Sequence, residues 1–206
     1  EIQKRSLLLE KEKSETELKL LKTQLNPHFL FNTLNNIYSL SVNSSPATSE
    51  SIGRLSEILD HVLYRCNADY VPLAGELSLL RNYIELEKLR YDERLQVNFT
   101  SLVDHEVYIA PLILLSLVEN AFKHGVSETR NHPFVDIHLS IKNRELLFIV
   151  KNSTGLNDED QNVKENIGLS NLRRQLELLY TDYNLSLQQS GPAFTATLKL
   201  NLASHA

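Results

Sequence analysis

The 206-residue sequence predicts an α+β fold, in which a helical hairpin precedes a sandwich with a mixed sheet and helices on one face. Two apolar stripes at helical spacing, joined by the polar segment 42–50, predict the hairpin. Short alternating segments interleaved with helical ones predict the sandwich. The composition changes at residues 67–72, which we interpret as the linker between the two parts.

The N-terminal segment 1–25 is highly charged and has leucines at a and d heptad positions, namely Leu7, Leu18, Leu21 and Leu25. It predicts a helix that pairs with a second copy, although a solvated single helix fits the pattern too. Pro27 then either kinks this helix or begins a new one with Asn26 as its N-cap.

The hairpin itself is predicted from two stripes. The first stripe comprises Leu30, Phe31, Leu34, Ile37 and Tyr38, and the second comprises Ile52, Leu55, Leu59, Val62 and Cys66. A lone hairpin leaves such stripes in water, so we expect two copies to pair into a four-helix bundle.

The second part is predicted to alternate helices and strands. Helices are expected at 73–94, 111–124 and 167–180, and strands at 95–100, 134–141, 146–151, 185–189 and 194–200. Gly125 is expected to end the second of these helices. Residues 152–166 are polar and predict a long loop that acts as a mobile lid.

Composition narrows the class of protein. The net charge of -5 argues against direct binding of nucleic acid. The single cysteine, Cys66, excludes an internal disulfide and favours a reducing compartment. No apolar stretch approaches the ~20 residues that span a bilayer. The chain lacks methionine, so we expect a fragment whose membrane segment, if it has one, lies before residue 1.

His28 is the candidate nucleophile. A neutral imidazole nitrogen is a good nucleophile near neutral pH. Asn32 lies four residues later on the same helical face and can hold one ring nitrogen in a hydrogen bond. Taken alone, however, a histidine after Asn-Pro at a helix start is commonly a polar surface residue.

The segment 25–35, LNPHFLFNTLN, resembles the phosphoacceptor segment of the LytS/YehU-type sensor histidine kinases. The resemblance extends over about residues 18–202. It implies a dimerisation and histidine phosphoacceptor domain at 1–68 and an ATP-binding catalytic domain of the GHKL type at 72–202. It also implies that His28 receives the phosphoryl group of ATP.

Residues 115–125, LSLVENAFKHG, resemble the N box of that ATP-binding domain. The resemblance implies that Asn120 ligates Mg²⁺, for which an amide oxygen is suitable, and that Lys123 and His124 lie near the phosphates. Many histidine kinases have an acid directly after the histidine, where this chain has Phe29. Either a neutral His28 needs little help from a base, or the base comes from elsewhere, and Glu119 is then our candidate.

Two weaker motifs complete the nucleotide site. Asn152 stands where the family's G1 box has an Asp that accepts a hydrogen bond from adenine, and its side-chain carbonyl can accept the same bond. Residues 166–174 resemble the G2 box, with Asn166, Gly168 and Leu169 at the start of a helix. Glycines and a helix N-terminus favour phosphate there. Gln175 replaces an arginine that is usual in this helix.

The resemblance implies a homodimeric sensor kinase of two-component signalling, with ATP and Mg²⁺ as cofactors. It would pass its phosphoryl group to an aspartate of a response regulator, which in this family is often of the LytTR type. The chain would be the cytoplasmic portion of a bacterial inner-membrane protein. The alternative is a GHKL pseudokinase that dimerises and binds nucleotide without autophosphorylation. The histidines lack metal-ligand spacing, which disfavours a metal-dependent hydrolase.

Overall fold

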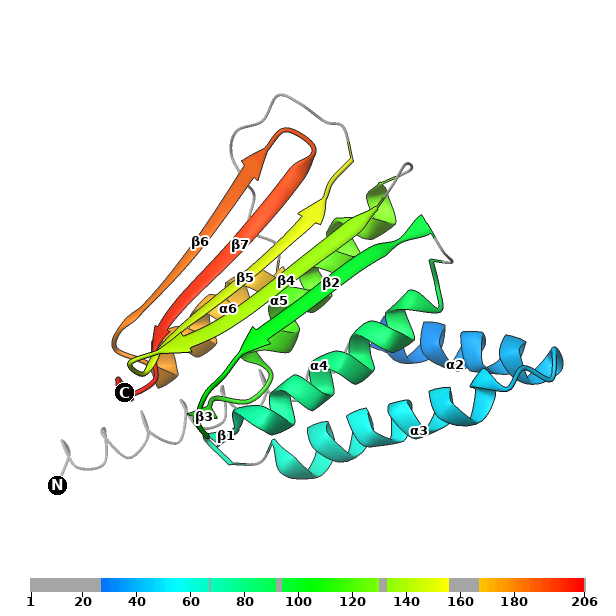
Figure 1. Cartoon of the computed structure of the whole chain (residues 1–206), viewed down its shortest axis with the longest axis horizontal. Helices are drawn as coiled ribbons and strands as arrows, with labels where there is room; N and C mark the ends of the chain where they lie inside the picture. Colours follow the sequence, from blue (N-terminus) through cyan, green and yellow to red (C-terminus); the bar gives the residue numbers. More distant parts are fainter. Residues whose placement is uncertain (1–26, 67, 92–93, 130–132, 156–166, 206) are drawn as a thin grey trace, which may run out of the picture.

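A computed structural model describes residues 27–66, 68–91, 94–129, 133–155 and 167–205. The predicted α+β class is confirmed: a helical hairpin is followed by a mixed sheet with helices packed on one of its faces (Figure 1). The segment 1–25, expected to form a paired helix, lies outside the described residues. No helix in the described part of the chain is long and apolar enough to cross a membrane.

The hairpin consists of α2 (Pro27–Val42) and α3 (Ala47–Asp60), and α3 continues into the π-helical turn η1 (His61–Arg65). The loop between the helices is shorter than the predicted 42–50, because both helices extend into that polar segment. Ser44 turns the chain with a positive φ of 51°. Ser45 accepts hydrogen bonds from Ala47 and Thr48, which stabilises the start of α3.

The buried face of α2 differs from the predicted stripe. Its buried residues are Phe29, Thr33 and Ile37, whereas Phe31, Leu34 and Tyr38 of the predicted stripe are exposed. On α3 and η1 the predicted Leu55, Val62 and Cys66 are buried, and Ile52 is exposed. The reason is that α2 has apolar residues around more than one face, and the face carrying Phe29 packs against the remainder of the chain.

Helix α4 (Leu73–Lys88) lies between the hairpin and the sheet domain (Figure 1). It ends at Lys88, six residues before the predicted end at position 94. Beyond this point the backbone N–H groups of Arg90 and Tyr91 donate to the carbonyl oxygens of Glu87 and Lys88, which forms single turns. Just before α4, the two-residue strand β1 (Val71–Pro72) pairs with β3 (Tyr108–Ile109). Strands this short have no alternation that a sequence pattern could reveal.

The main sheet has the strand order β2-β4-β5-β7-β6. Its members are β2 (Gln96–Leu102), β4 (Phe134–Lys142), β5 (Glu145–Ser153), β6 (Tyr183–Ser190) and β7 (Ala193–Asn201). Strands β2 and β4 are parallel and the other pairs are antiparallel, so the sheet is mixed as predicted. The predicted turn at Asn143-Arg144 has positive φ at both residues, which suits a tight hairpin.

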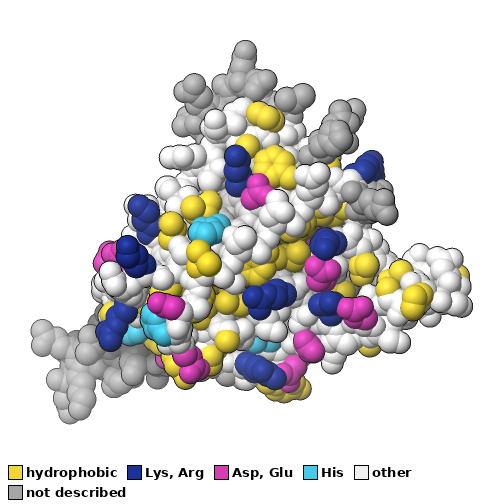
Figure 2. Space-filling view, viewed as in Figure 1, with side chains coloured by type: hydrophobic (Ala, Val, Ile, Leu, Met, Phe, Trp, Pro, Cys, Tyr) yellow, Lys and Arg dark blue, Asp and Glu magenta, His cyan; other side chains and the backbone are white. Residues whose placement is uncertain are grey.

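Helices α5 (Ile113–His124) and α6 (Ile167–Leu179) cover one face of this sheet (Figure 1). In β4 the inward side chains Val135, Ile137, Leu139 and Ile141 are buried, and the residues between them are partly exposed. The opposite face carries charged side chains of both signs (Figure 2). One continuous apolar core runs from Phe29 on α2 to Leu202.

A buried carboxylate fixes the start of α5. Glu76, in the first turn of α4, is fully buried. One of its oxygens lies 2.8 Å from Nε2 of His61, and the other accepts the backbone N–H of Leu112 at 2.8 Å. Leu112 has a φ of 66°, and this hydrogen bond holds it in that strained backbone geometry at the N-cap of α5.

The thiol of Cys66 lies within 4.8 Å of the His61 and Glu76 ligand atoms, a set that suits a metal ion. Both oxygens of Glu76 already accept hydrogen bonds from protein donors. We therefore interpret this cluster as a clamp that joins η1, α4 and α5.

Substituting Glu76→Gln should lower the free energy of unfolding by roughly 2–4 kcal/mol, because the amide NH₂ would face a donor and leave a buried polar group unpaired. Urea unfolding measures this loss. Glu85→Gln, which alters an exposed carboxylate on the same helix, should change it by less than about 0.5 kcal/mol. A Glu76→Gln protein as stable as the parent would contradict the clamp.

Candidate functional site

Helix α5 carries the predicted N box and separates its apolar and polar residues. Leu114, Leu117, Val118 and Ala121 are buried in the core. Asn120 is partly exposed, and Lys123 and His124 are exposed. Positions 120, 123 and 124 share one face of a helix, so these three polar side chains lie together at the surface of the site.

Asn152 lies inside β5, not in the predicted loop, because the strand pairs with β7 as far as Ser153. Its side chain is 2% exposed. The amide nitrogen donates to the carbonyl of Ser153 at 2.9 Å, and the carbonyl oxygen Oδ1 is buried with no partner among the described residues. A buried acceptor without a donor is costly, and a ligand's N–H group would satisfy it. The hydroxyl of Thr154 nearby in sequence is buried and unpartnered in the same way.

Gly125 ends α5 as predicted, but its φ of -100° is not the left-handed conformation that usually explains a glycine at a helix end. The requirement is for space. A Cβ at this position would lie 2.0 Å from Nδ2 of Asn152 and 2.5 Å from the carbonyl oxygen of Ala121. Because only glycine permits this approach, the end of the N-box helix packs directly against Asn152.

The predicted G2 segment is described only in part. Gly168 is exposed in the first turn of α6, where backbone N–H groups favour anions. The side chain of Leu169 is 2% exposed and belongs to the core, so only its backbone can meet a ligand. Asn166 and the predicted lid residues 156–166 lie outside the described residues. Gln175 donates to the carbonyl of Pro111 at 3.1 Å, which joins α6 to the chain just before α5.

His28 lies in the first turn of α2 and is exposed. The predicted contact with Asn32 is present: the Asn32 amide nitrogen is 3.1 Å from both Nδ1 and Nε2 of the ring. Because the two distances are equal, this contact does not select which ring nitrogen carries the proton.

A chain of aromatic rings connects His28's helix to the N-box helix. Phe29 is 2% exposed, and its ring centroid lies 4.7 Å from that of Tyr83 on α4. Tyr83 in turn contacts Phe122 on α5 edge to face, at 5.9 Å. The predicted apolar stripe did not include Phe29. The signal that could have found it is the spacing of Phe29, Thr33 and Ile37, four residues apart on one face.

Two carboxylates lie near this chain of rings: Glu87, which is buried and was not predicted, and Glu119, which is half-buried. Glu87 is 1% exposed; it accepts from the Tyr83 hydroxyl at 3.2 Å and from Arg90 at 2.7 Å. Burial raises the pKa of Glu87, and the charge of Arg90 and the Tyr83 hydrogen bond oppose this rise. Burial, followed by the negative charge of Glu87, raises the pKa of Glu119 to about 7, and Lys123 opposes that shift.

The chain is similar to histidine kinases and sensor proteins of several bacteria. Residues 16–95 match the histidine kinase family model. The chain is 32% identical over 190 residues to the sensor histidine kinase BtsS of Escherichia coli, an alignment that covers 91% of this chain and 34% of BtsS. It is 31% identical over 179 residues to the sensor protein LytS of Staphylococcus haemolyticus, covering 81% of this chain and 30% of LytS. The chain thus spans about a third of the length of these relatives.

Solved structures agree on the fold. The histidine kinase domain of the blue-light activated kinase EL346 from Erythrobacter litoralis superposes with a TM-score of 0.54 at 15% identity, covering 93% of this chain and 96% of that one. The catalytic domain of the histidine kinase ThkA gives a TM-score of 0.51 at 14% identity, covering 66% of this chain and 97% of that domain. The predicted sandwich of histidine kinase catalytic domains is confirmed.

The raised pKa of Glu119 makes the stability of the fold depend on pH. A carboxyl group with a higher pKa in the folded chain contributes stability that is fully present below its unfolded pKa of 4.5 and is lost as pH rises through about 7. Above that pH the folded chain must bury an ionised carboxylate, a cost that glutamine does not have.

The difference in free energy of unfolding between Glu119→Gln and the parent should therefore shift in favour of the variant by on the order of 2 kcal/mol as the pH rises from 5 to 8. Urea unfolding at the two pH values, without Mg²⁺ or nucleotide, measures the difference. Glu177→Gln, on the surface of α6, should show no comparable pH-dependent gain. An equal effect of Glu119→Gln at both pH values would refute the raised pKa.

Proposed function

Because the chain is related to the LytS-type sensor histidine kinases, we propose that it transfers the γ-phosphoryl group of ATP to His28 and then to an aspartate of a response regulator. The proposed reaction makes it an ATP-dependent protein-histidine kinase of a two-component system. It uses residues 1–68 as the dimerisation and phosphoacceptor domain and residues 72–202 as the ATP-binding domain.

The observation that best supports a nucleotide site is the side-chain carbonyl of Asn152, which is buried beside the end of α5 and has no donor among the residues that the structure describes. The 6-amino group of adenine is a donor of the kind that this acceptor lacks. The amide nitrogen of Asn152 is already engaged by the Ser153 carbonyl, which leaves the oxygen to face the base. The replacement of the usual Asp by Asn therefore retains the acceptor and removes only its charge.

We assign the phosphates to the polar face of α5 and the start of α6. The side-chain carbonyl of Asn120 suits a hard cation, and Mg²⁺ bound there would neutralise phosphate charge. Lys123 and His124 are exposed on the same face and can meet phosphate oxygens. Backbone N–H groups at Gly168 and Leu169 favour the anion at the α6 terminus, and Asn166 just before them is assigned to the same group.

In the proposed transfer, the lone pair of one His28 ring nitrogen forms a bond to the γ-phosphorus of ATP. The bond from that phosphorus to the bridging oxygen breaks, and its electron pair leaves with ADP. The N–H proton on the other ring nitrogen passes to a base, for which we assign Glu119, whose pKa of about 7 lies close to that of a free imidazole. In the second transfer the N–P bond breaks as a carboxylate oxygen of the response regulator attacks phosphorus.

The exposed face of the hairpin supports the proposed homodimer. Phe31, Leu34, Tyr38 and Val42 follow one line along α2, and each is more than half exposed. Large apolar side chains gathered on one helix face are typical of a partner-binding surface. A second copy would cover them in a four-helix bundle. A regulator of the LytTR type as phosphoryl acceptor, and a place on the cytoplasmic side of a bacterial inner membrane, complete the proposal. Contact with the membrane would come only from residues outside this chain.

A nucleotide-binding pseudokinase is the second candidate, because Asn replaces Asp at position 152 and the G2 segment lacks two of its usual glycines. Such a protein would bind ATP and dimerise without forming phosphohistidine.

Incubation with γ-labelled ATP and Mg²⁺ separates the two candidates. The parent chain should acquire label that is lost in acid and stable in alkali, as a phosphoramidate is. His28→Ala should acquire none. His105→Ala, which removes an exposed histidine from the loop after β2, should be labelled like the parent. A parent chain that binds ATP but stays unlabelled would establish the pseudokinase, and equal labelling of His28→Ala would exclude His28 as the acceptor.

A further inference from the structure

The clamp of His61, Cys66 and Glu76 brings together the three kinds of side chain that bind zinc in proteins, namely an imidazole, a thiol and a carboxylate. Their ligand atoms all lie within 4.8 Å of one another. The three residues are only 7%, 4% and 0% exposed, which distinguishes them from the acidic clusters that are common on protein surfaces. The proposed kinase reaction uses none of them.

The π-helical turn η1 is the element that places His61 and Cys66 side by side. The two residues are five positions apart, and on an α-helix of 3.6 residues per turn their side chains would point about 140° away from each other. In η1 the backbone N–H of Cys66 donates to the carbonyl of His61 at 3.1 Å, five residues back. This wider turn brings Cys66 round to the side of His61, and π-turns inside helices are frequent at functional sites. The turn therefore creates a ligand pair that the sequence spacing did not indicate.

We propose that Nε2 of His61, Sγ of Cys66 and Oε1 of Glu76 form a binding site for Zn²⁺ or a similar thiophilic divalent cation. The inference goes beyond the proposed kinase activity and does not depend on it. The bound ion joins the end of the hairpin to the first turn of α4. The second oxygen of Glu76 keeps its hydrogen bond from the backbone N–H of Leu112, so the start of α5 stays in place.

The charges of the three ligands balance the charge of the ion. A thiolate and a carboxylate carry two negative charges together, and a neutral imidazole adds none, so the site with Zn²⁺ has no net charge. This balance matters because Glu76 is fully buried, where an uncompensated charge is costly. Mg²⁺ prefers a shell of oxygen ligands and retains several waters, so the thiol and the imidazole select against it.

Binding of the ion exchanges it for protons that the clamp holds. In the clamp, Nε2 of His61 donates to Oε1 of Glu76 at 2.8 Å. Zinc takes the place of the proton between these two atoms; His61 then carries its proton on Nδ1, and the Cys66 thiol releases its proton to solvent. Zinc bonds of about 2.0–2.3 Å place tetrahedral ligand atoms roughly 3.3–3.7 Å apart, so each of the three atoms needs to move by about 1 Å or less. Three protein ligands leave the fourth position for a water molecule.

Gly75 gives the His61 ring its space beside α4. A Cβ at position 75 would lie 3.1 Å from Cε1 of His61, which is closer than a side chain ordinarily packs. The ring therefore lies against the backbone of α4 with Nε2 already directed at Glu76. A ligand that is oriented before the ion arrives loses little freedom on binding, which favours affinity.

Cobalt tests the thiolate ligand without any substitution. Cys66 is the only cysteine in the chain, so a thiolate-to-Co²⁺ charge-transfer band in the near ultraviolet can come from Cys66 alone. The reduced, metal-free chain should develop this band with one equivalent of Co²⁺, and one equivalent of Zn²⁺ should then remove it. Absence of the band from the folded chain would overturn the proposal.

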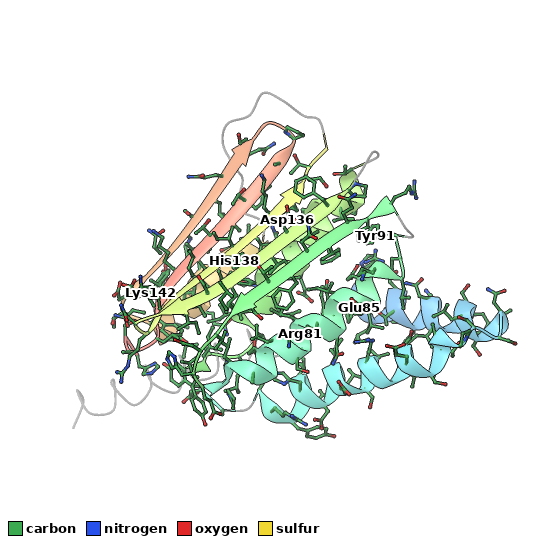
Figure 3. The ribbon with its side chains drawn as sticks, in the orientation of Figure 1. Arg81, Glu85, Tyr91, Asp136, His138 and Lys142 are labelled. Atoms are coloured by element: carbon green, nitrogen blue, oxygen red, sulfur yellow. The ribbon has the colours of Figure 1, made fainter. Side chains whose placement is uncertain are left out.

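Zinc affinity identifies the other ligands and is measured by competition with a chromophoric chelator in excess Mg²⁺. Cys66→Ala and His61→Gln should each weaken Zn²⁺ binding by more than about 100-fold, because loss of a ligand costs more than loss of a supporting group. His61→Gln retains an N–H donor for Glu76, so it removes the imidazole and keeps the clamp. His138→Ala removes a histidine from β4, in the sheet (Figure 3), and should bind Zn²⁺ like the parent.

Urea unfolding separates loss of the site from loss of the fold. Without metal, Cys66→Ala and His61→Gln should each unfold in one cooperative transition. Zn²⁺ should raise the midpoint urea concentration of the parent and of His138→Ala, and it should leave the midpoints of the two ligand variants unchanged. Equal affinity and equal stabilisation in the parent and Cys66→Ala would show that zinc binds elsewhere on the chain, and would overturn the proposal. None of these measurements uses ATP, so their result stands whether or not the chain forms phosphohistidine.

Discussion

The packing of Tyr83 between Phe29 and Phe122 is the contact on which the rest of the arrangement depends. It joins α2, α4 and α5 through three buried rings. Burial of a large apolar side chain contributes about 1.5–3 kcal/mol, and each favourable ring pair adds about 0.5–1.5 kcal/mol. These ring contacts, together with the packing of Leu30 and Ile37 on the same core, hold a helix whose opposite face is apolar and exposed. The phosphoacceptor candidate and the N-box helix share one core because of Tyr83.

Helix α4 reinforces this contact with a buried carboxylate at each end. Glu76 in its first turn binds His61 and the backbone of Leu112, so it fixes where α5 begins. Glu87 in its last turn binds Tyr83, on which Phe29 at the start of α2 packs, and Arg90. Each carboxylate is costly to bury and each is paired by donors from the protein, which makes their positions specific. The helix therefore sets the register between hairpin and sheet domain at two separate points.

The proposed nucleotide site also depends on a close contact between two elements, the end of α5 and strand β5. Gly125 lets the end of α5 touch Asn152, whose buried oxygen has no hydrogen-bond partner in the described part of the chain. The end of α5 and Asn152 thus lie in contact although they are 27 positions apart in the sequence. The departure from Asp to Asn, which favours a pseudokinase when taken alone, still leaves a hydrogen-bond acceptor where we propose that adenine binds.

Local patterns predicted much of the fold. Alternation found β4 and β5, the Asn143-Arg144 turn was recognised, and helical spacing found α5 with its core face. Such patterns did not predict the contacts between residues that lie far apart in the sequence. The buried states of Glu76 and Glu87 depend on partners in other elements, and charged residues are read from sequence as solvated. The face of α2 that packs was misassigned because two of its faces are apolar, and only α4 decides between them.

The central claim is that His28, and no other nucleophile near the N box, accepts the phosphoryl group. Mass-spectrometric mapping of the phosphorylated chain, digested and separated at alkaline pH to preserve phosphohistidine, tests this most directly. The account predicts one phosphoryl group, on the peptide that contains His28. Phosphate on Lys123, on His124 or on any other residue of the reacted chain, with the His28 peptide unmodified, would contradict it.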